Sequence, residues 1–287
     1  MKEYRPRLNQ DEYNLILNHR GKLEIPVIKK AHILLLDIET APILAYVWSL
    51  WKPTIAHMQI DKDWFMISWR AKWLLEEEMF GDVLTPKEAI NQDDKRVTKS
   101  IWEMINEADI VIAHNGNKFD LPKLNTRFVY HGIEPPMSYQ SIDTLAIAKK
   151  HFKFTSNRLD YLGDFLGVGR KIPTDWTLWE KCYFGDLEAL ENMYMYNGQD
   201  VLLLEDVYIK LRPYIKSHPN LGVFSDEIVS QCPNCGSTKL NWGGTPYTTG
   251  VGRYTSFRCL DCGAVGHSRI SELDKYKRKE LVTSCAR

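Results

Sequence analysis

Three short motifs, far apart in the sequence, carry four acidic residues and one tyrosine. They read LLLDIET with Asp37 and Glu39, HNGNKFDLP with Asp120, and YNGQD with Tyr196 and Asp200. Each motif lies at a definable position in a strand or helix pattern. The motifs therefore indicate which elements carry the polar groups.

The first motif belongs to a continuous apolar run, residues 32–39, whose length and composition predict a buried strand. Side chains on a strand alternate between its two faces, so Asp37 and Glu39 are expected to point the same way. A second β-branched run, residues 109–114, ends at an Asn-Gly turn signal. We therefore predict two strands that each end in a polar motif.

The third motif lies within residues 187–215, where apolar side chains recur at roughly helical spacing. Asp200 follows Tyr196 by four positions, which places both on one face of that helix. Asp120 is expected to open another helix just past the Asn-Gly turn. The intervening segments are interpreted as scaffold, with a strand at 64–69, a strand end leading to a helix at 141–145, and a helix at 159–166 ended by Gly167 and Gly169.

This set of side chains suits one kind of chemistry. Phosphodiester hydrolysis with two divalent cations uses carboxylates to hold metals ~3.5–4 Å apart. Hard oxygen ligands favour Mg²⁺ or Mn²⁺, and a tyrosine hydroxyl can orient the attacking water. Two nearby residues are ambiguous: Asp143 caps a helix or supports a metal ligand, and Lys171 is a solvated lysine or a phosphate contact.

At these motifs the chain resembles the DnaQ-like 3′–5′ exonucleases of the DEDDy, or tyrosine, subclass. The residues of the second and third motifs are similar to the corresponding motifs in the proofreading domain of family B DNA polymerases. A histidine-subclass member would have a histidine five positions before the last aspartate, where Met195 stands. The resemblance implies an α/β fold over residues 31–217, a ribonuclease H-like mixed β-sheet flanked by helices.

The resemblance also assigns roles. It implies that Asp37, Glu39 and Asp200 bind one metal ion, with Asp37 bridging to the second and Asp120 acting on that second ion through water. Tyr196 would position the nucleophilic water. The residues implied in binding the terminal nucleotide are Asn115, Phe119 and Thr40.

Charge is unevenly distributed in this chain of 287 residues, although its formal net charge is zero. Residues 1–30, an expected N-terminal extension, carry seven Lys or Arg against four acids, and residues 218–287 carry nine against six. A basic excess can attract phosphate, or it is ordinary solubilising charge. No run of ~18 apolar residues and no signal-peptide core is evident, which predicts a cytoplasmic protein that enters no membrane.

A second domain, a zinc ribbon with a basic C-terminal tail, is expected at residues 218–287. Two Cys-x-x-Cys knuckles, separated by 23 residues, predict one structural Zn²⁺ site; the ligands are Cys232, Cys235, Cys259 and Cys262. Disulfides are the competing interpretation, and His267 is a weaker alternative ligand. Cys182 and Cys285 are expected to be free thiols. The segment 239–257 is expected to form a hairpin.

The sequence thus predicts a metal-dependent 3′–5′ exonuclease that acts on single-stranded DNA, with RNA as an alternative, in DNA replication or repair. The ribbon would contact nucleic acid or dock a replication or repair protein. Two other functions remain open. One is a ribonuclease H-like endonuclease or junction-cleaving enzyme that uses the same carboxylates, and the other is a non-catalytic recruitment module.

Overall fold

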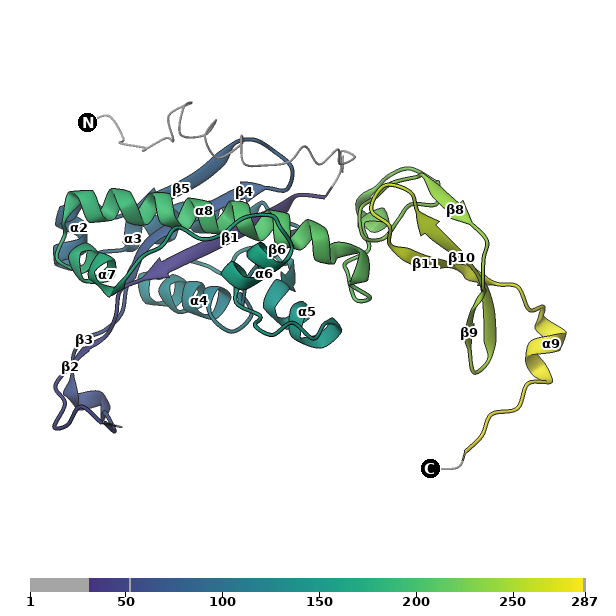
Figure 1. Cartoon of the computed structure of the whole chain (residues 1–287), viewed down its shortest axis with the longest axis horizontal. Coiled ribbons are helices and arrows are strands. Elements are labelled where there is room, and N and C mark those ends of the chain that lie inside the picture. The colour runs from purple at the N-terminus through teal and green to yellow at the C-terminus, as the bar shows by residue number, and fades with distance from the viewer. Residues whose placement is uncertain (1–30, 52, 286–287) are drawn as a thin grey trace. The chain divides into compact units, whose positions relative to one another are not determined.

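The computed structural model describes residues 31–51 and 53–285. Within that part the chain forms two compact units: the first runs from His32 to Tyr208, and the second comprises the residues from Ile209 onward together with Ala31 (Figure 1). The N-terminal extension expected at residues 1–30 lies outside the described residues. The domain boundaries expected from the sequence stay a prediction.

The first unit is built on a five-stranded mixed sheet with the order β5-β4-β1-β6-β7. Strands β1 and β4 are antiparallel, as are β4 and β5, whereas β6 runs parallel to both β1 and β7. The strands are β1 (Ile33–Thr40), β4 (Met66–Trp73), β5 (Met79–Val83), β6 (Ile110–Ala113) and β7 (Gln140–Asp143). The mixed sheet expected from the sequence is confirmed.

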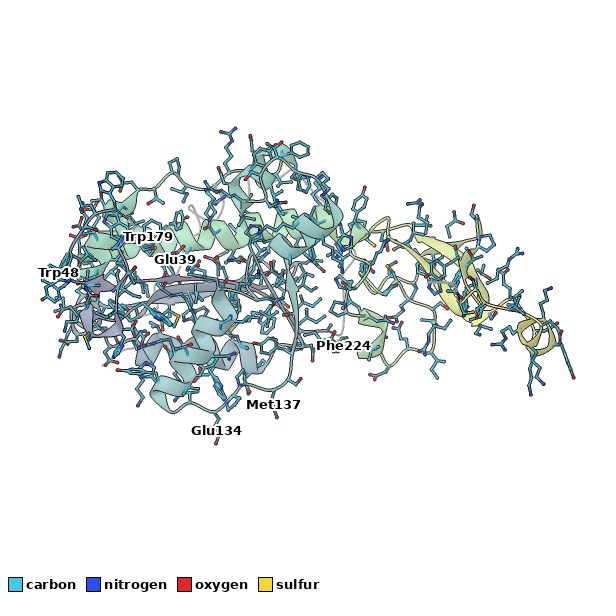
Figure 2. The ribbon with its side chains drawn as sticks, turned by 90° about the horizontal axis from the view of Figure 1, so that it is seen from below. Glu39, Trp48, Glu134, Met137, Trp179 and Phe224 are labelled. Carbon is cyan, nitrogen blue, oxygen red and sulfur yellow. The ribbon has the colours of Figure 1, made fainter. Side chains whose placement is uncertain are left out.

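Helices cover both faces of this sheet. The helices are α2 (Pro86–Asn91), α3 (Lys95–Asn106), α4 (Asp120–His131), α5 (Thr144–His151), α6 (Leu159–Phe165), α7 (Trp176–Tyr183) and α8 (Leu187–Leu211). Figure 2 shows the sheet edge-on, with the long green helix α8 along one face and α4 along the other. The predicted helices opened by Asp120 and carrying Tyr196 are both confirmed.

Polar residues of β4 show which face of β1 meets α8. Asp37 pairs across the sheet with Arg70, and Glu39 pairs with Ser68. Directly paired residues point to the same face, and Arg70 lies 3.8 Å from the centroid of the Tyr194 ring on α8. Asp37 and Glu39 therefore point toward α8, while the alternate residues of β1 pack into the apolar core.

A buried ion pair joins the sheet to the same helix. Lys72 of β4 is paired with Glu205 of α8, and both side chains are at most 2% exposed. Glu205 also accepts a hydrogen bond of 2.7 Å from the backbone N–H of Leu75. These contacts fix the rotation of α8 against the sheet, and with it the direction of Tyr196 and Asp200.

An arm that the sequence analysis did not anticipate joins β1 to β4. It comprises residues 42–63 and contains β2 (Leu44–Ala45), the 3₁₀ turn η1 (His57–Gln59) and β3 (Ile60–Lys62). Strands β2 and β3 are antiparallel. Figure 1 shows the arm projecting from the end of β1 that carries the acidic motif.

The second unit is a small antiparallel sheet preceded by two 3₁₀ turns. The elements are η2 (Arg212–Tyr214), η3 (Leu221–Phe224), β8 (Leu240–Trp242), β9 (Tyr247–Thr249), β10 (Gly252–Cys259), β11 (Val265–Ser271) and α9 (Lys275–Lys279). In place of one hairpin over residues 239–257, β8 and β9 both pair with the long strand β10. Across both units, none of the described helices has the length and apolarity needed to span a bilayer.

Candidate active site and metal centre

Three carboxylates meet where β1 faces α8. One oxygen each from Asp37, Glu39 and Asp200 lies within 4.8 Å of the other two. Two buried oxygens, Oδ2 of Asp37 and Oδ1 of Asp200, have no hydrogen-bond partner among the described residues. Buried oxygens are normally satisfied, so this arrangement is one in which cations would complete the coordination.

Burial and mutual repulsion make these acids hard to ionise. Burial, followed by the charge of Asp120, raises the pKa of Asp37 well above its ordinary value. Burial and the charge of Asp200 raise the pKa of Glu39 to about 8. Burial raises the pKa of Asp200 as well, although Lys171 opposes that shift. The cluster is a site where bound positive charge would be strongly favoured.

Asp120, the first residue of α4, lies beside this cluster. Its Oδ1 accepts a hydrogen bond of 3.2 Å from the backbone N–H of Ile38, between the two acids of β1. The side chain is buried, and that burial raises its pKa to about 7. Among the described residues, Asp120 is outside the group of three whose oxygens lie within 4.8 Å. It therefore contributes negative charge from one side of the cluster.

Lys171 supplies the counter-charge. Its Nζ is ion-paired with Asp200 and lies 3.3 Å from the hydroxyl oxygen of Tyr196. The interpretation of Lys171 as a solvated lysine was therefore wrong, because the segment after α6 returns to the helix that carries Asp200. Burial and the charge of Asp200 raise the pKa of Tyr196 to about 12, which keeps its hydroxyl protonated near neutral pH.

Trp179 contacts two residues of the acidic motifs, and the sequence did not identify it. Its Nε1 donates a hydrogen bond of 3.2 Å to Oε2 of Glu39. Its ring also lies edge-to-face against Tyr196, with centroids 5.8 Å apart. No motif marked Trp179, since its relation to Glu39 depends on the packing of α7 against the end of β1.

The turn after β6 explains the second motif. Asn115 has a positive φ of 69°, and its backbone N–H donates a hydrogen bond of 3.0 Å to Oδ1 of Asp143. A Cβ at Gly116 would lie 2.5 Å from the Cβ of Ala113, so glycine is required there. Asp143 also caps α5 through Ala146. It therefore performs the predicted capping and braces the turn that leads to Asp120.

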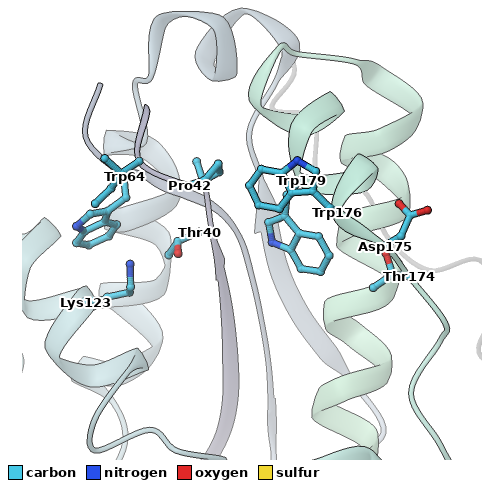
Figure 3. A pocket seen from close by; sticks show the side chains of 10 residues that line it. Thr40, Pro42, Trp64, Lys123, Thr174, Asp175, Trp176 and Trp179 are labelled. Carbon is cyan, nitrogen blue, oxygen red and sulfur yellow. The ribbon is translucent and has the colours of Figure 1, made fainter. Parts of the chain in front are cut away.

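A pocket of about 650 Å³ opens beside the acidic cluster (Figure 3). Trp64 and Lys123 lie on one side, Trp176 and Trp179 on the other, and Thr40 between them. The Nζ of Lys123 is 3.7 Å from the centroid of the Trp64 ring. The pocket thus combines flat aromatic surfaces with one cationic group. Its lining residues are Thr40, Ala41, Pro42, Ile43, Trp64, Lys123, Thr174, Asp175, Trp176 and Trp179.

The three residues expected to bind the terminal nucleotide lie in different places. Thr40 lines the pocket. Phe119 is 37% exposed and is absent from the lining of that pocket, although its ring centroid is 5.1 Å from Nζ of Lys123. Asn115 serves the turn described above. The structure therefore brings Thr40 to the pocket directly, and Phe119 only to its edge.

The four expected zinc ligands also converge. Their sulfur atoms lie within 4.8 Å of one another; the residues are Cys232, Cys235, Cys259 and Cys262. The sulfurs of Cys232 and Cys262 are 3.6 Å apart, well beyond the roughly 2.05 Å of a disulfide. All described cysteines are free thiols. The ring of His267 stacks on Tyr247 at 4.1 Å, and its Nδ1 lies 2.8 Å from the carbonyl oxygen of Ser268.

The donor sets of the two sites fit different metals. Three carboxylates with two unsatisfied buried oxygens suit a hard cation such as Mg²⁺ or Mn²⁺. Four cysteine sulfurs with no open position suit structural Zn²⁺. The Cys₄ cluster is consistent with the predicted zinc ribbon, while the identity of each metal stays a prediction.

Comparison with known proteins gives an independent indication of the fold. Residues 80–212 match the model of the RNase_H superfamily. A stretch of 92 residues is 33% identical to the DNA polymerase III PolC-type of Ureaplasma parvum serovar 3 (strain ATCC 700970). That alignment covers 26% of this chain and 6% of the polymerase.

A solved structure shows a likeness over a longer part of the chain. The family B DNA polymerase from the hyperthermophilic archaeon Pyrobaculum calidifontis aligns with a TM-score of 0.49 and 16% sequence identity. The alignment covers 65% of this chain and 25% of that polymerase. The superfamily match and the mixed sheet together lead to one conclusion: the first unit is a ribonuclease H-like α/β domain.

Proposed function

We propose that this protein is a metal-dependent 3′–5′ exonuclease that removes nucleotides from nucleic-acid ends, with single-stranded DNA as the favoured substrate. The observation that supports this most is the meeting of Asp37, Glu39 and Asp200, with a buried unsatisfied oxygen on each aspartate. A purely structural cluster of three acids would be destabilising, because buried like charges repel. The aromatic pocket beside the cluster suits a terminal nucleotide.

In this proposal each residue has a distinct task. Asp37, Glu39 and Asp200 would hold one Mg²⁺ or Mn²⁺, Asp37 would also face a second, and Asp120 would act on the second through water. When bound, the two ions supply activation of water and neutralisation of charge on the leaving oxygen. Thr40, Asn115 and Phe119 would surround the terminal nucleotide.

Tyr196 and Lys171 have proposed roles other than binding metal. The Tyr196 hydroxyl stays protonated, so it can donate a hydrogen bond to a water molecule or a phosphate oxygen. Nζ of Lys171 lies beside both the hydroxyl of Tyr196 and the carboxylate of Asp200. We assign Lys171 the task of holding these two groups in one orientation before the cations bind.

The second unit is assigned a separate task. The Cys₄ cluster would bind one structural Zn²⁺, and the ribbon would contact the strand or dock a replication or repair protein. Arg253 is ion-paired with Glu272, and Arg258 donates to the carbonyl oxygen of Gly263. The short helix α9, with three exposed lysines and one exposed arginine, is therefore the part of the ribbon with the most available positive charge.

One experiment tests the proposal against its main alternative. Purified protein is incubated with Mg²⁺ or Mn²⁺ and with single strands of DNA and RNA, either linear with a 5′ label or circular with an internal label, beside Asp37→Ala. We expect a ladder shortening from the 3′ end of linear strands, with circles intact and the variant inactive. Cutting of circles would identify an endonuclease, and no cutting under any condition would favour the recruitment module.

A further inference from the structure

The arm formed by residues 42–63 exposes an unusual amount of aromatic surface. Tyr46 is 71% exposed, Trp48 is 98% exposed and Trp51 is 87% exposed. Most large aromatic side chains are largely buried. Three such rings within six positions therefore indicate a surface that is covered by something else during function.

The base of the arm is ordered by its own hydrogen bonds. The backbone N–H of Tyr46 donates to the carbonyl oxygen of Gln59 at 2.9 Å, and Nε2 of Gln59 donates back to the carbonyl oxygen of Tyr46 at 2.9 Å. Oε1 of Gln59 also accepts from the N–H of Ala56 at 2.9 Å. Gln59 thus holds both sides of the arm together just before the exposed rings.

The arm continues directly from the proposed active site. It begins two positions after Thr40, the last residue of β1, and its first residues, Pro42 and Ile43, line the pocket that also contains Trp179. Figure 2 shows Trp48 at the end of the domain that also carries Glu39 and Trp179. The arm therefore forms one rim of the pocket, next to any strand whose last nucleotide occupies it.

We propose that the arm is a stacking surface for the single-stranded nucleic acid that leads into the pocket, with Trp48 and Trp51 as its main contacts. This inference rests on the function proposed above. Aromatic rings bind bases of any sequence through their faces, which suits an enzyme that must accept every nucleotide. The arm is formally neutral, with two lysines and two aspartates, so stacking and not phosphate attraction would provide its binding energy.

The test compares strand binding by the full-length protein and by Trp48→Ala/Trp51→Ala. Fluorescence anisotropy is measured without added Mg²⁺ or Mn²⁺, using labelled single strands of about 4 and about 16 nucleotides. We expect at least about tenfold weaker binding of the longer strand and little change for the shorter one. Because the arm is neutral, the salt dependence of binding should be unchanged.

Two controls separate stacking from other effects. Trp48→Phe/Trp51→Phe keeps two rings and should recover most of the affinity for the longer strand. Phe184→Ala removes a ring that is 66% exposed and does not belong to the described pocket lining, so it should leave both affinities unchanged. Thermal unfolding of all variants checks that the fold is intact.

Several outcomes would overturn the assignment. Unchanged binding of the longer strand in Trp48→Ala/Trp51→Ala would exclude the arm as a strand contact. A wild-type dimer that this variant converts to a monomer would identify the arm as a protein interface. If the arm variants weaken binding while the wild-type protein cleaves nothing, the exonuclease proposal fails and the stacking surface stands. Normal cleavage by the wild-type protein, together with unchanged strand binding by Trp48→Ala/Trp51→Ala, would contradict the arm proposal alone.

Discussion

At the scale of single residues, the acidic site lowers the stability of the folded protein when no metal is bound. Two buried and two half-buried carboxyl groups lie near one another, and their pKa values are raised above those of free side chains. Lys171, paired with Asp200, is the cation that the site itself supplies within the described part of the chain. Binding of divalent cations would therefore stabilise the fold as well as prepare the chemistry.

The raised pKa values predict how the stability of the metal-free protein depends on pH. Raised pKa values mean that the folded state holds protons that the unfolded state has released. The free energy of unfolding should therefore fall as the pH rises from about 4.5 toward 8, the pKa of Glu39. Urea unfolding in metal-free buffer measures this, and added Mg²⁺ should reduce the fall. A stability that stays flat over this range, or rises, would contradict the assigned burial.

Trp179 allows a test of metal positioning apart from chemistry. Trp179→Phe keeps an aromatic ring but removes the hydrogen bond to Glu39. We expect Mn²⁺ affinity, measured by titration calorimetry, to weaken about tenfold, as is typical when a group that orients a ligand is lost. Trp176→Phe is the matched control, because Trp176 lines the same pocket from the same helix. Equal losses of Mn²⁺ affinity in the two variants would show that Trp179 only lines the pocket and does not orient Glu39.

At the scale of elements, the contacts between β4 and α8 decide whether the third motif reaches the first. Glu205→Ala removes the carboxylate that is ion-paired with the buried Lys72, and breaking one partner of a buried pair typically costs about 3–5 kcal/mol. We expect the midpoint of urea unfolding to drop accordingly. Lys72→Met/Glu205→Leu should recover much of the loss. A single variant as stable as the wild type would show that the pair does not hold α8.

The sequence predicts those features that depend on local patterns and misses those that depend on contacts between distant parts of the chain. β1 and α8 were predictable because strand alternation and helical spacing are local patterns, and Asp37 and Asp200 were found with them. The positions of Lys171 and Trp179 were not predictable, because their contacts with Asp200 and Glu39 bridge 29 and 140 residues. The arm escaped prediction because its apolar residues resemble core residues until their exposure is known.

At the scale of the whole molecule, the two compact units predict two separate dependences on metal. The sulfur cluster forms the centre of a small core together with Ala264 and Leu240. A core of this size gives little stability by itself, so a structural metal is needed. We therefore predict that the second unit depends on Zn²⁺ for its stability and the first on Mg²⁺ or Mn²⁺ for the proposed activity.

This separation predicts the effect of removing zinc. Metal analysis should find about one Zn²⁺ per chain, and Cys259→Ser should reduce it strongly. Limited proteolysis should then cut the second unit while the first, ending at Tyr208, stays resistant. Cys285→Ser is the control, since Cys285 is exposed and lies outside the cluster. Full zinc content in Cys259→Ser would contradict the four-cysteine site.

The central claim is that Asp37, Glu39 and Asp200 form a cation site, and a crystal soaked with Mn²⁺ tests it most directly. Anomalous difference density should show Mn²⁺ at ordinary coordination distances, roughly 2.0–2.2 Å, from Oδ2 of Asp37 and Oδ1 of Asp200, the two buried oxygens without a protein partner. The same soak of Asp37→Asn should show weaker density. Absence of a peak at these oxygens in the wild-type crystal would contradict the account.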